Sequence, residues 1–296
     1  MEKESEIETT NESNSPFVRS VGGDGTNDPV AEHPGFESVR SAIVSFVGDR
    51  VFEANATGVV VAMSGGIDST LTAMLAVEAL GRERVLGLGL PCNESDDRGG
   101  TEARNMAEGL GIEFREVHLR PLLDIFEDSV APAIDPGGDR HAIGNVIARL
   151  RMICTYYAAN TRSRLVLGTG NRSERLLGYF TKYGDGGADL CPIADLYKTE
   201  VRALASRMGV PRRIVTKQPT AGLWTGQTDA DDLGAPYEVI DPVLRRLVDG
   251  ESVEATADAV NMDVDTVRSI AERYTETRHK RYTPPTPGVD GSRLDG

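Results

Sequence analysis

The sequence predicts an α/β protein with a doubly wound, mostly parallel sheet and helices on both faces. A buried run of β-branched residues, Val59 to Val61, enters a glycine turn and then an apolar helical segment. Further strand-like runs follow at 85–90, 112–119 and 164–168, each separated from the last by a helical pattern. Such alternation is typical of parallel strands with helical crossovers. With 296 residues, 39% of them hydrophobic, the chain can build a full core around this sheet.

The other elements follow from apolar periodicity and from glycine and proline breakers. An amphipathic helix over 36–52 precedes the first strand, and its partner, the core or a second subunit, stays open. The helix after the glycine turn is expected to end near Leu80, with Gly81 as its cap. Further helices are expected at 101–111, 121–130, 141–160, 198–209, 236–248, 253–260 and 264–281. The polar segment 91–100 is either a mobile lid or a plain surface loop, and together with the irregular segment 217–230 it is a candidate cover for the site.

Composition divides the chain into one folded domain and two flanking segments. Residues 1–34 are rich in Glu, Ser, Asn, Gly and Asp and poor in apolar side chains, which predicts a disordered acidic arm. The folded domain is expected over 35–287. Residues 288–296 are expected to form a C-terminal tail.

Charge and cysteine content narrow the class of protein. The net charge is −14 and the isoelectric point is about 4.8, which argues against binding to nucleic acid or to an anionic membrane. The three cysteines, Cys92, Cys154 and Cys191, are far apart and show no disulfide or metal-ligand spacing. There is no long apolar run and no signal peptide pattern. We therefore expect a cytoplasmic protein with small-molecule substrates.

The segment Ser64-Gly65-Gly66-Ile67-Asp68-Ser69 lies between the first strand and its helix. Its glycines let an anion approach the backbone, and the N–H groups of the first helical turn have no intrahelical acceptor. An ordinary glycine turn with a helix-capping Asp is the plain alternative. A carboxylate beside a phosphate needs a bridging cation, which Mg²⁺ with a nucleoside triphosphate supplies. The full string favours a pyrophosphate-binding loop without the lysine of a Walker loop.

A second cluster of polar residues follows the strand at 164–168. Within about thirty residues come Thr169, Glu174, Lys182, Asp185, Asp189 and Lys198, interleaved with glycines. Turn formation explains the glycines and aspartates, but it explains the two lysines less well. Because this cluster lies at the carboxyl end of a strand, we expect it to face the ligand site.

Five blocks in this order resemble the ammonia-dependent NAD⁺ synthetases, which belong to the N-type ATP pyrophosphatases. The blocks are SGGIDS, GTGNRSE, FTKYGDGGADLCPIADLYKTEV, PTAGLWTGQTD with the LG and Tyr after it, and the final HKR with its prolines. The resemblance spans about Phe36 to Pro287. It implies a Rossmann-like ATP pyrophosphatase fold. It also implies ATP-dependent amidation of deamido-NAD⁺ to NAD⁺ by ammonia, through an adenylated intermediate, with release of AMP and pyrophosphate.

The resemblance also implies roles for individual residues. Asp185, Lys198 and Asp68 would be catalytic, with Asp185 receiving ammonium and taking a proton from it. Asp68 and Glu174 would bind Mg²⁺. The ATP site would comprise Ala62, Met63, Ser64, Gly65, Gly66, Ile67, Asp68, Ser69, Thr169, Lys198 and Thr220. The deamido-NAD⁺ site would comprise Arg149, Lys182, Asp189, His279 and Lys280, with Arg151 as an alternative to Arg149. A homodimer is expected by the same resemblance.

Departures from the family pattern are small, and two rival functions stay open. Ala62 stands where Gly is usual, and Thr220 stands where Ser is more usual. The chain has no room for a glutaminase domain, so free ammonia, or ammonia from a separate protein, is the expected nitrogen source. The first rival is another ATP pyrophosphatase such as a GMP synthetase. The second is a non-catalytic nucleotide-binding protein on the same sheet.

Overall fold

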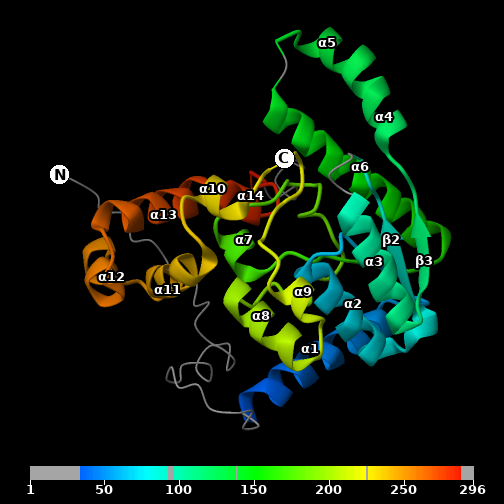
Figure 1. Ribbon diagram of the computed structural model, residues 1–296, viewed down its shortest axis with the longest axis horizontal. Coiled ribbons are helices and arrows are strands. Elements are labelled where there is room, and N and C mark those ends of the chain that lie inside the picture. The colour runs from blue at the N-terminus through cyan, green and yellow to red at the C-terminus, as the bar shows by residue number, and fades with distance from the viewer. Residues whose placement is uncertain (1–33, 93–96, 138, 225, 288–296) are drawn as a thin grey trace, which may run out of the picture.

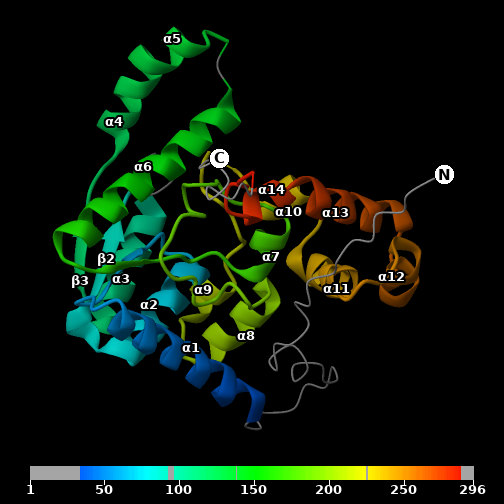
Figure 2. The same cartoon turned by 180° about the vertical axis from the view of Figure 1, so that it is seen from behind.

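The computed structural model describes residues 34–92, 97–137, 139–224 and 226–287 (Figures 1 and 2). The predicted arm, apart from Pro34, and the predicted tail lie outside these residues. The sheet has four strands, β1 (Val59–Ala62), β2 (Val85–Gly89), β3 (Glu113–Glu116) and β4 (Leu165–Leu167). Their order is β3-β2-β1-β4 and every pair is parallel, with Val60 opposite both Leu86 and Val166.

The strand order reverses at β1. The chain runs outward from β1 through β2 to β3 and then returns, through a long connection, to place β4 on the other side of β1. In an open parallel sheet the ligand crevice lies at such a switch point, beyond the carboxyl ends of the two strands. The segments that follow β1 and β4 are the two polar clusters that the sequence singled out.

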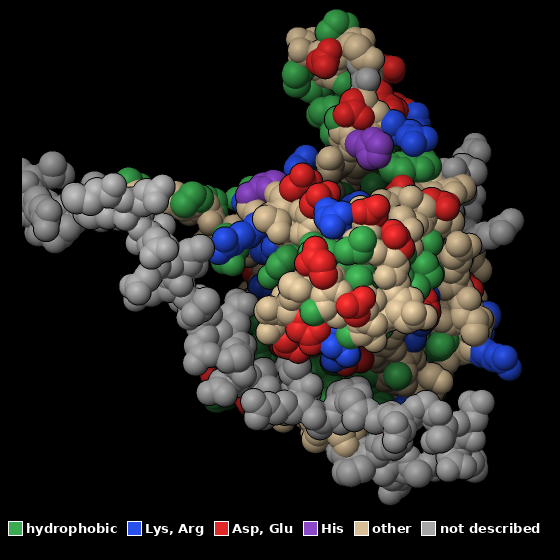
Figure 3. All heavy atoms as spheres, turned by 90° about the vertical axis from the view of Figure 1, so that its left-hand side faces the viewer, with side chains coloured by type: hydrophobic (Ala, Val, Ile, Leu, Met, Phe, Trp, Pro, Cys, Tyr) green, Lys and Arg blue, Asp and Glu red, His purple; other side chains and the backbone are tan. Residues whose placement is uncertain are grey.

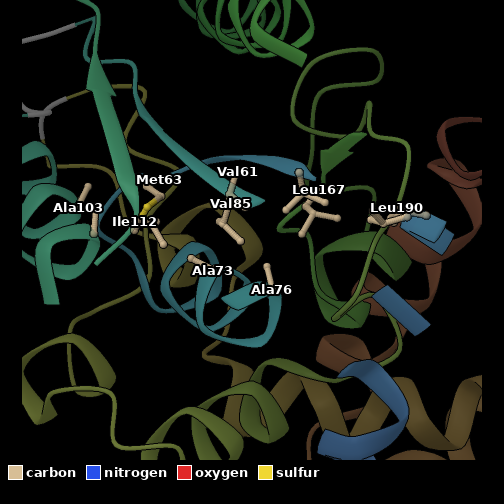
Figure 4. Close-up of a cluster of buried hydrophobic side chains, with 12 residues drawn as sticks. Val61, Met63, Ala73, Ala76, Val85, Ala103, Ile112, Leu167 and Leu190 are labelled. Carbon is tan, nitrogen blue, oxygen red and sulfur yellow. The ribbon is translucent and has the colours of Figure 1, made fainter. Parts of the chain in front are cut away.

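Helices cover both faces of the sheet, which confirms the predicted fold class. On one face, Val59 and Val61 share a buried cluster with alanines of α2 (Ile67–Leu80) and α3 (Asp97–Leu110); Figure 4 shows Val61 near Ala73 of α2, and Ala103 of α3 beside Ile112. On the other face, Val60 packs with Ile147 of α6 (Arg140–Thr161). Small alanine side chains let the helices approach the strands closely, and the burial of this apolar surface stabilises the fold.

The first helix, α1 (Pro34–Glu53), packs on the core of its own chain. Phe36, Ile43 and Val44 contact the cluster that holds Leu71 and Leu75 of α2. Its last turns are anchored by two valines, Val47 and Val51, that are fully buried. The sequence left open whether this helix packs on the core or on a second subunit, and the structure shows that this face packs on the core.

A helical lobe adjoins the β4 side of the sheet (Figure 1). It is built from α7 (Arg172–Leu176), α8 (Lys198–Arg207), α9 (Arg212–Val215), α10 (Asp229–Leu233), α11 (Tyr237–Val248), α12 (Val253–Val260), α13 (Val264–Glu276) and α14 (Arg278–Arg281). A core of apolar residues from α7, α11, α12 and α13 holds it together. The lobe places α8 and α10 beside the switch point.

A helical hairpin projects from the opposite side of the sheet. One arm is an uninterrupted helical run of α4 (Arg120–Ile125), a π-helical turn η3 (Phe126–Val130) and α5 (Ala131–Ile134), and the other arm is the N-terminal part of α6, which α4 contacts. Figure 3 shows it standing clear of the body at the top, with hydrophobic side chains on its surface. No helix among the described residues is long and apolar enough to cross a membrane.

Several boundaries differ from those that the sequence predicted. α3 begins at Asp97, four residues before Thr101, because Gly99 and Gly100 form part of its first turns instead of ending a loop. β3 keeps only four residues of its predicted span 112–119, from the second to the fifth. The predicted helix 264–281 ends at Glu276 and resumes as α14 after Thr277. A single 3-10 turn, η1 (Arg82–Arg84), follows Gly81 before β2.

Candidate active site

A cavity of about 720 Å³ opens at the switch point. Its walls come from the loop after β1, the segment after β4, the first half of α6, residues 217–224, and the helices α8, α10 and α13. Segments far apart in the sequence meet here because the strand order reverses between β1 and β4. The two polar clusters thus face one cavity, as predicted.

The loop after β1 forms a compact turn at the N-terminus of α2. The Ser69 hydroxyl donates to the Gly66 carbonyl at 3.2 Å and accepts from the Ser64 N–H at 3.2 Å. Gly65 has a φ of +71°, which favours glycine. Asp68 lies in the first turn of α2, where the helix dipole favours negative charge. The remaining N–H groups of this turn form an anion-binding helix end that faces the cavity.

Lys198 joins the two polar clusters. Its buried ammonium donates to Asp68 Oδ2 at 2.6 Å and to Glu174 Oε1 at 2.9 Å. Asn171 caps α7, accepts from the Glu174 N–H at 3.1 Å, and donates through Nδ2 to Asp68 Oδ1 at 2.9 Å. The Lys198 N–H donates to Ser173 Oγ at 2.9 Å, which fixes the start of α8. The trio of Asp68, Glu174 and Lys198 is therefore held from three helices.

Charge in the trio is finely balanced. Burial raises the pKa of Glu174 to about 7; the charge of Lys198 opposes this rise, and the Asp68 carboxylate adds to it. Burial alone would lower the pKa of the Lys198 ammonium, but its two carboxylate partners outweigh burial and hold that pKa above its usual value. With both carboxylates charged, the trio carries one negative charge in excess, which a bound cation would relieve.

Asp68 and Glu174 fit a magnesium site completed by a nucleotide. Both carboxylates contact the same lysine nitrogen, so one cation can reach both. No group of three or more His, Cys, Asp or Glu side chains that could hold a metal occurs in the described part of the chain. Mg²⁺ commonly takes one or two carboxylates and fills its other positions with phosphate oxygens and water. The donor set matches that pattern.

Two residues that the sequence analysis missed stand beside the trio. Asp229 is 3% exposed and accepts a hydrogen bond from the Tyr237 hydroxyl at 2.9 Å. The Tyr237 ring lies under the Lys198 ammonium, 5.4 Å from its centre. Asp229 Oδ1 has no hydrogen-bond partner, although it is buried. Asp229 is the last residue of the block PTAGLWTGQTD, but in the string TDADDLG it looks like an ordinary helix-start residue, so the sequence did not indicate that it is buried.

Four of the predicted deamido-NAD⁺ residues are linked by hydrogen bonds or lie next to one another in the chain, but of the five predicted residues only Lys280 belongs to the cavity lining. Arg149 donates to the Lys182 carbonyl at 3.2 Å, and Lys182 Nζ donates to the His279 carbonyl at 3.0 Å. Lys280 lines the cavity and donates to the Gly178 and Phe180 carbonyls at 2.8 and 3.1 Å. Arg151, the alternative to Arg149, also lines the cavity and donates to the Leu90 carbonyl at 3.1 Å.

Asp185 and Asp189 have different surroundings. Asp185 lines the cavity and accepts from the Thr181 N–H at 2.9 Å. Desolvation by the surrounding protein atoms raises its pKa, but the residue is exposed to the open cavity, which weakens that effect. Asp189 does not belong to the cavity lining. It accepts hydrogen bonds from the Val166 N–H of β4 at 2.7 Å and from the Tyr156 hydroxyl of α6 at 3.1 Å, and so connects the strand to the helix.

The other predicted ATP residues lie around the cavity. Ala62, Met63, Ser64, Gly66, Ile67, Ser69, Thr169 and Thr220 all contribute to its wall, and Gly65 lies within the same turn. Thr220 Oγ1 accepts from the Gly222 N–H at 3.0 Å, which shapes the 217–224 segment. The tryptophan that follows, Trp224, also lines the cavity, with Arg140 stacked 4.4 Å above its ring.

The fold and this site define an α/β nucleotide-binding protein of the ATP pyrophosphatase class, and comparison with known proteins places it within that class. The family model described as NAD synthase matches residues 39–284. The NH(3)-dependent NAD(+) synthetase of Methanococcoides burtonii is 46% identical over 86% of this chain and 97% of its own length. The Halobacterium salinarum enzyme of the same description is 44% identical over 84% and 92%. The chain therefore belongs to the NAD synthase family.

Solved structures agree with this assignment. An NH3-dependent NAD synthetase from Campylobacter jejuni superposes with a TM-score of 0.71 at 27% identity, over 85% of this chain and 98% of that one. An NMN synthetase from Francisella tularensis superposes with a TM-score of 0.74 at 32% identity, over 86% and 99%. The second likeness makes the acceptor nucleotide a point to test.

Proposed function

We propose that the protein amidates the nicotinate carboxylate of deamido-NAD⁺ with ammonia, using ATP and releasing AMP and pyrophosphate. The observation that carries this proposal is the trio of Asp68, Glu174 and Lys198 at the N-terminus of α2. It combines an anion-binding helix end with two carboxylates suited to a metal–triphosphate complex. The curated relatives, 41–46% identical, support deamido-NAD⁺ as the acceptor.

In the first step the nicotinate carboxylate attacks the α-phosphorus of ATP, and pyrophosphate leaves. Negative charge develops on the equatorial and leaving oxygens, so fixed donors at the helix end stabilise the transition state. Lys198 is held rigidly among its partners and can donate to these oxygens. Bound Mg²⁺, held by Asp68 and Glu174, would supply further charge neutralisation.

In the second step ammonia attacks the carbonyl carbon of the adenylate, and AMP leaves. Ammonium dominates at neutral pH, so a carboxylate that attracts the cation and accepts its proton assists this step. We assign this role to Asp185, which faces the cavity and is held by the Thr181 N–H. Burial raises the pKa of Asp185, and the hydrogen bond from the Thr181 N–H and the cations Arg151 and Lys280 oppose this rise, which favours the charged form that attracts ammonium. Arg149, Lys182, Asp189, His279 and Lys280 are proposed to hold the acceptor.

The proposal is tested by incubating the protein with ATP, Mg²⁺, ammonium and one acceptor at a time. The acceptors are deamido-NAD⁺, the corresponding nicotinate mononucleotide and xanthosine monophosphate. We expect pyrophosphate and amide product with deamido-NAD⁺. Product from the mononucleotide alone would reassign the acceptor. Product from xanthosine monophosphate alone would favour the GMP synthetase alternative, and no pyrophosphate with any acceptor would favour a non-catalytic nucleotide-binding protein.

We propose further that the protein is a homodimer. Six of the eleven large hydrophobic side chains that are exposed in the described residues lie on the projecting hairpin and α6. They are Leu122, Ile125, Val130, Ile134, Ile153 and Tyr157. Apolar surface gathered in this way is typical of a protein–protein interface.

The three cysteines are free, which supports the expected reducing, cytoplasmic location.

A further inference from the structure

The cations of the cavity wall differ in how firmly they are held. Five lysine and arginine side chains of the described residues line it: Arg151, Lys198, Lys217, Arg273 and Lys280. Lys198 is bound by the two carboxylates of the trio. Arg151, Arg273 and Lys280 each donate to main-chain carbonyls. Lys217 differs, because its partner is a carboxylate of another segment, Glu102, at the long distance of 3.5 Å.

Lysine is scarce in this chain, and its placement is uneven. The sequence contains 5 lysines and 27 arginines. Three of the lysines line the cavity, but only two of the arginines do. Surface basic charge is therefore provided almost wholly by arginine, and lysine is concentrated at the site. An ammonium is a compact, mobile point charge that suits phosphate oxygens. A lysine at position 217, in a chain that otherwise uses arginine for its surface cations, therefore points to an anionic ligand.

The position of Glu102 places Lys217 beside the phosphate loop. A Cβ built on Gly65 would lie 3.0 Å from the Glu102 Cβ, so α3 carries this glutamate against the loop. The Lys217 ammonium contacts Glu102 Oε2. Only the side chain of Glu102 therefore separates this ammonium from the turn that precedes α2.

A further cation of the protein near this loop would favour the binding of a polyphosphate. Lys198 is shared between two carboxylates, so the trio leaves an excess negative charge that repels a polyphosphate. A partly exposed ion pair such as Glu102 with Lys217 contributes little on its own and breaks readily. A lysine that can leave Glu102 at little cost is free to follow an anion that arrives at the helix end.

We propose that Lys217 binds the pyrophosphate part of the nucleotide, and that Glu102 is its partner when the site holds no phosphate. On binding, the ammonium moves from Glu102 to the β- and γ-phosphate oxygens, and Arg213 remains beside Glu102, at 3.8 Å in this structure. This inference rests on the proposed function in one respect, namely that phosphates bind at the N-terminus of α2. It adds a phosphate-binding residue and a competing carboxylate.

Three single variants test the exchange. Lys217→Met should weaken the binding of magnesium pyrophosphate and of α,β-methylene-ATP about tenfold, the loss expected for one charge-assisted hydrogen bond. Glu102→Gln should tighten both about two- to fivefold, because the ammonium no longer has a competing anion. Arg213→Met is the matched control: it removes a cation from the same glutamate but does not line the cavity. Its dissociation constants should stay within about twofold of the wild type.

Calorimetry on the full chain with these two ligands gives the dissociation constants without any amidation reaction. If wild type binds both ligands but makes no amide, the proposed function fails while the Lys217 inference is still decided by the variants. Equal effects of Lys217→Met and Arg213→Met would overturn the inference, as would unchanged or weaker binding by Glu102→Gln. In the Lys217→Met background, Glu102→Gln should lose most of its effect. Should Lys217→Met fail to fold, Glu102→Gln alone decides, since only tighter binding supports the exchange.

Discussion

Gly65 and Gly99 lie backbone against backbone. A Cβ on Gly65 would approach the Gly99 carbonyl oxygen to 2.3 Å, and a Cβ on Gly99 would approach the Ser64 carbonyl oxygen to 2.5 Å. Real Cβ atoms do not come so close to main-chain oxygens, so each glycine makes room for the other segment. The first turn of α3 therefore packs directly against the backbone of the phosphate loop. Gly99, which the sequence analysis placed in the loop 91–100, is therefore a packing residue of the site.

Substitution of Gly99 should disturb the phosphate loop, whereas substitution of another glycine in the same helix should not. Gly99→Ala is expected to lower the free energy of unfolding by about 1–3 kcal/mol because it overpacks this contact. It should also weaken magnesium pyrophosphate binding. Gly109→Ala is the control, because Gly109 is also in α3 and has nothing within 4 Å of the new methyl group. It should leave binding unchanged and add up to about 1 kcal/mol of stability. Urea unfolding and calorimetry measure both, and equal losses in the two variants would contradict the packing argument.

The sequence predicted the parts of the fold that depend on local patterns. The buried strand at Val59 to Val61 and the glycine cap at Gly81 are local signals, and both agree with the structure. Helix α3 was predicted to start too late because two glycines read as a loop. The role of Gly99 is set by a contact with Ser64 and Gly65, more than thirty positions away in the sequence, which no local pattern encodes.

The site was predictable only where a motif marks it. Asp68, Glu174 and Lys198 were found through family motifs, and the structure brings them together. Asp229 and Tyr237 stand in one of the family blocks, but they were given no role there, because burial of a polar residue depends on how the helical lobe packs against α8. The role of Asp189 in binding the acceptor stays a prediction, since its oxygens are engaged by Val166 and Tyr156 in this structure.

Binding of a metal–phosphate complex should release a proton from Glu174. The pKa of its carboxyl is raised to about 7, so near pH 7 it is roughly half protonated. A cation favours the charged carboxylate and lowers this pKa, which expels the proton. We expect wild type to release more protons on binding than Glu174→Gln does at pH 7. Binding to wild type should weaken as the pH falls below 7, because protons then compete with the cation.

Calorimetry of magnesium pyrophosphate binding in buffers of different ionisation enthalpy measures this release. Protons that come from the ligand itself are the same for both proteins, so the difference between them isolates Glu174. Glu174→Gln should bind more weakly than wild type but with a smaller pH dependence between 5.5 and 7.5, a window chosen around about pH 7. Identical proton release from the two proteins would show that Glu174 is already ionised before the ligand binds.

The hydrogen bond from Tyr237 to Asp229 should be important for stability. Tyr237→Phe removes the donor at 2.9 Å and leaves a buried carboxylate oxygen without it. We expect a loss of about 1–3 kcal/mol in the free energy of unfolding, the cost of an unsatisfied buried polar group. Asp229→Asn in the same background should recover part of that loss, because it removes the buried charge. Tyr282→Phe, at an exposed ring, should change stability by no more than about 0.5 kcal/mol.

Urea unfolding of these four proteins gives the comparison. A Tyr237→Phe variant as stable as wild type would mean that the hydroxyl is replaceable by water and that Asp229 is better solvated than its 3% exposure indicates. Activity provides a second readout. The Tyr237 ring remains under the Lys198 ammonium in the phenylalanine variant, so adenylation should fall much less than in a variant that removes the ring, such as Tyr237→Leu.

The exposed face of α6 should control assembly. Ile153 is 64% exposed and Tyr157, one helical turn further along, is 72% exposed, so both lie on one side of the helix. Replacing both with glutamate places two charges where we propose that a second copy packs, which opposes burial of that face. Light scattering should give twice the mass of one chain for the wild type and the mass of one chain for the double variant. Phe52→Glu provides the control, because Phe52 is 82% exposed but lies at the end of α1. It should remain dimeric. A monomeric wild type at micromolar concentration, or equal dissociation by Phe52→Glu, would place the subunit contact elsewhere or remove it.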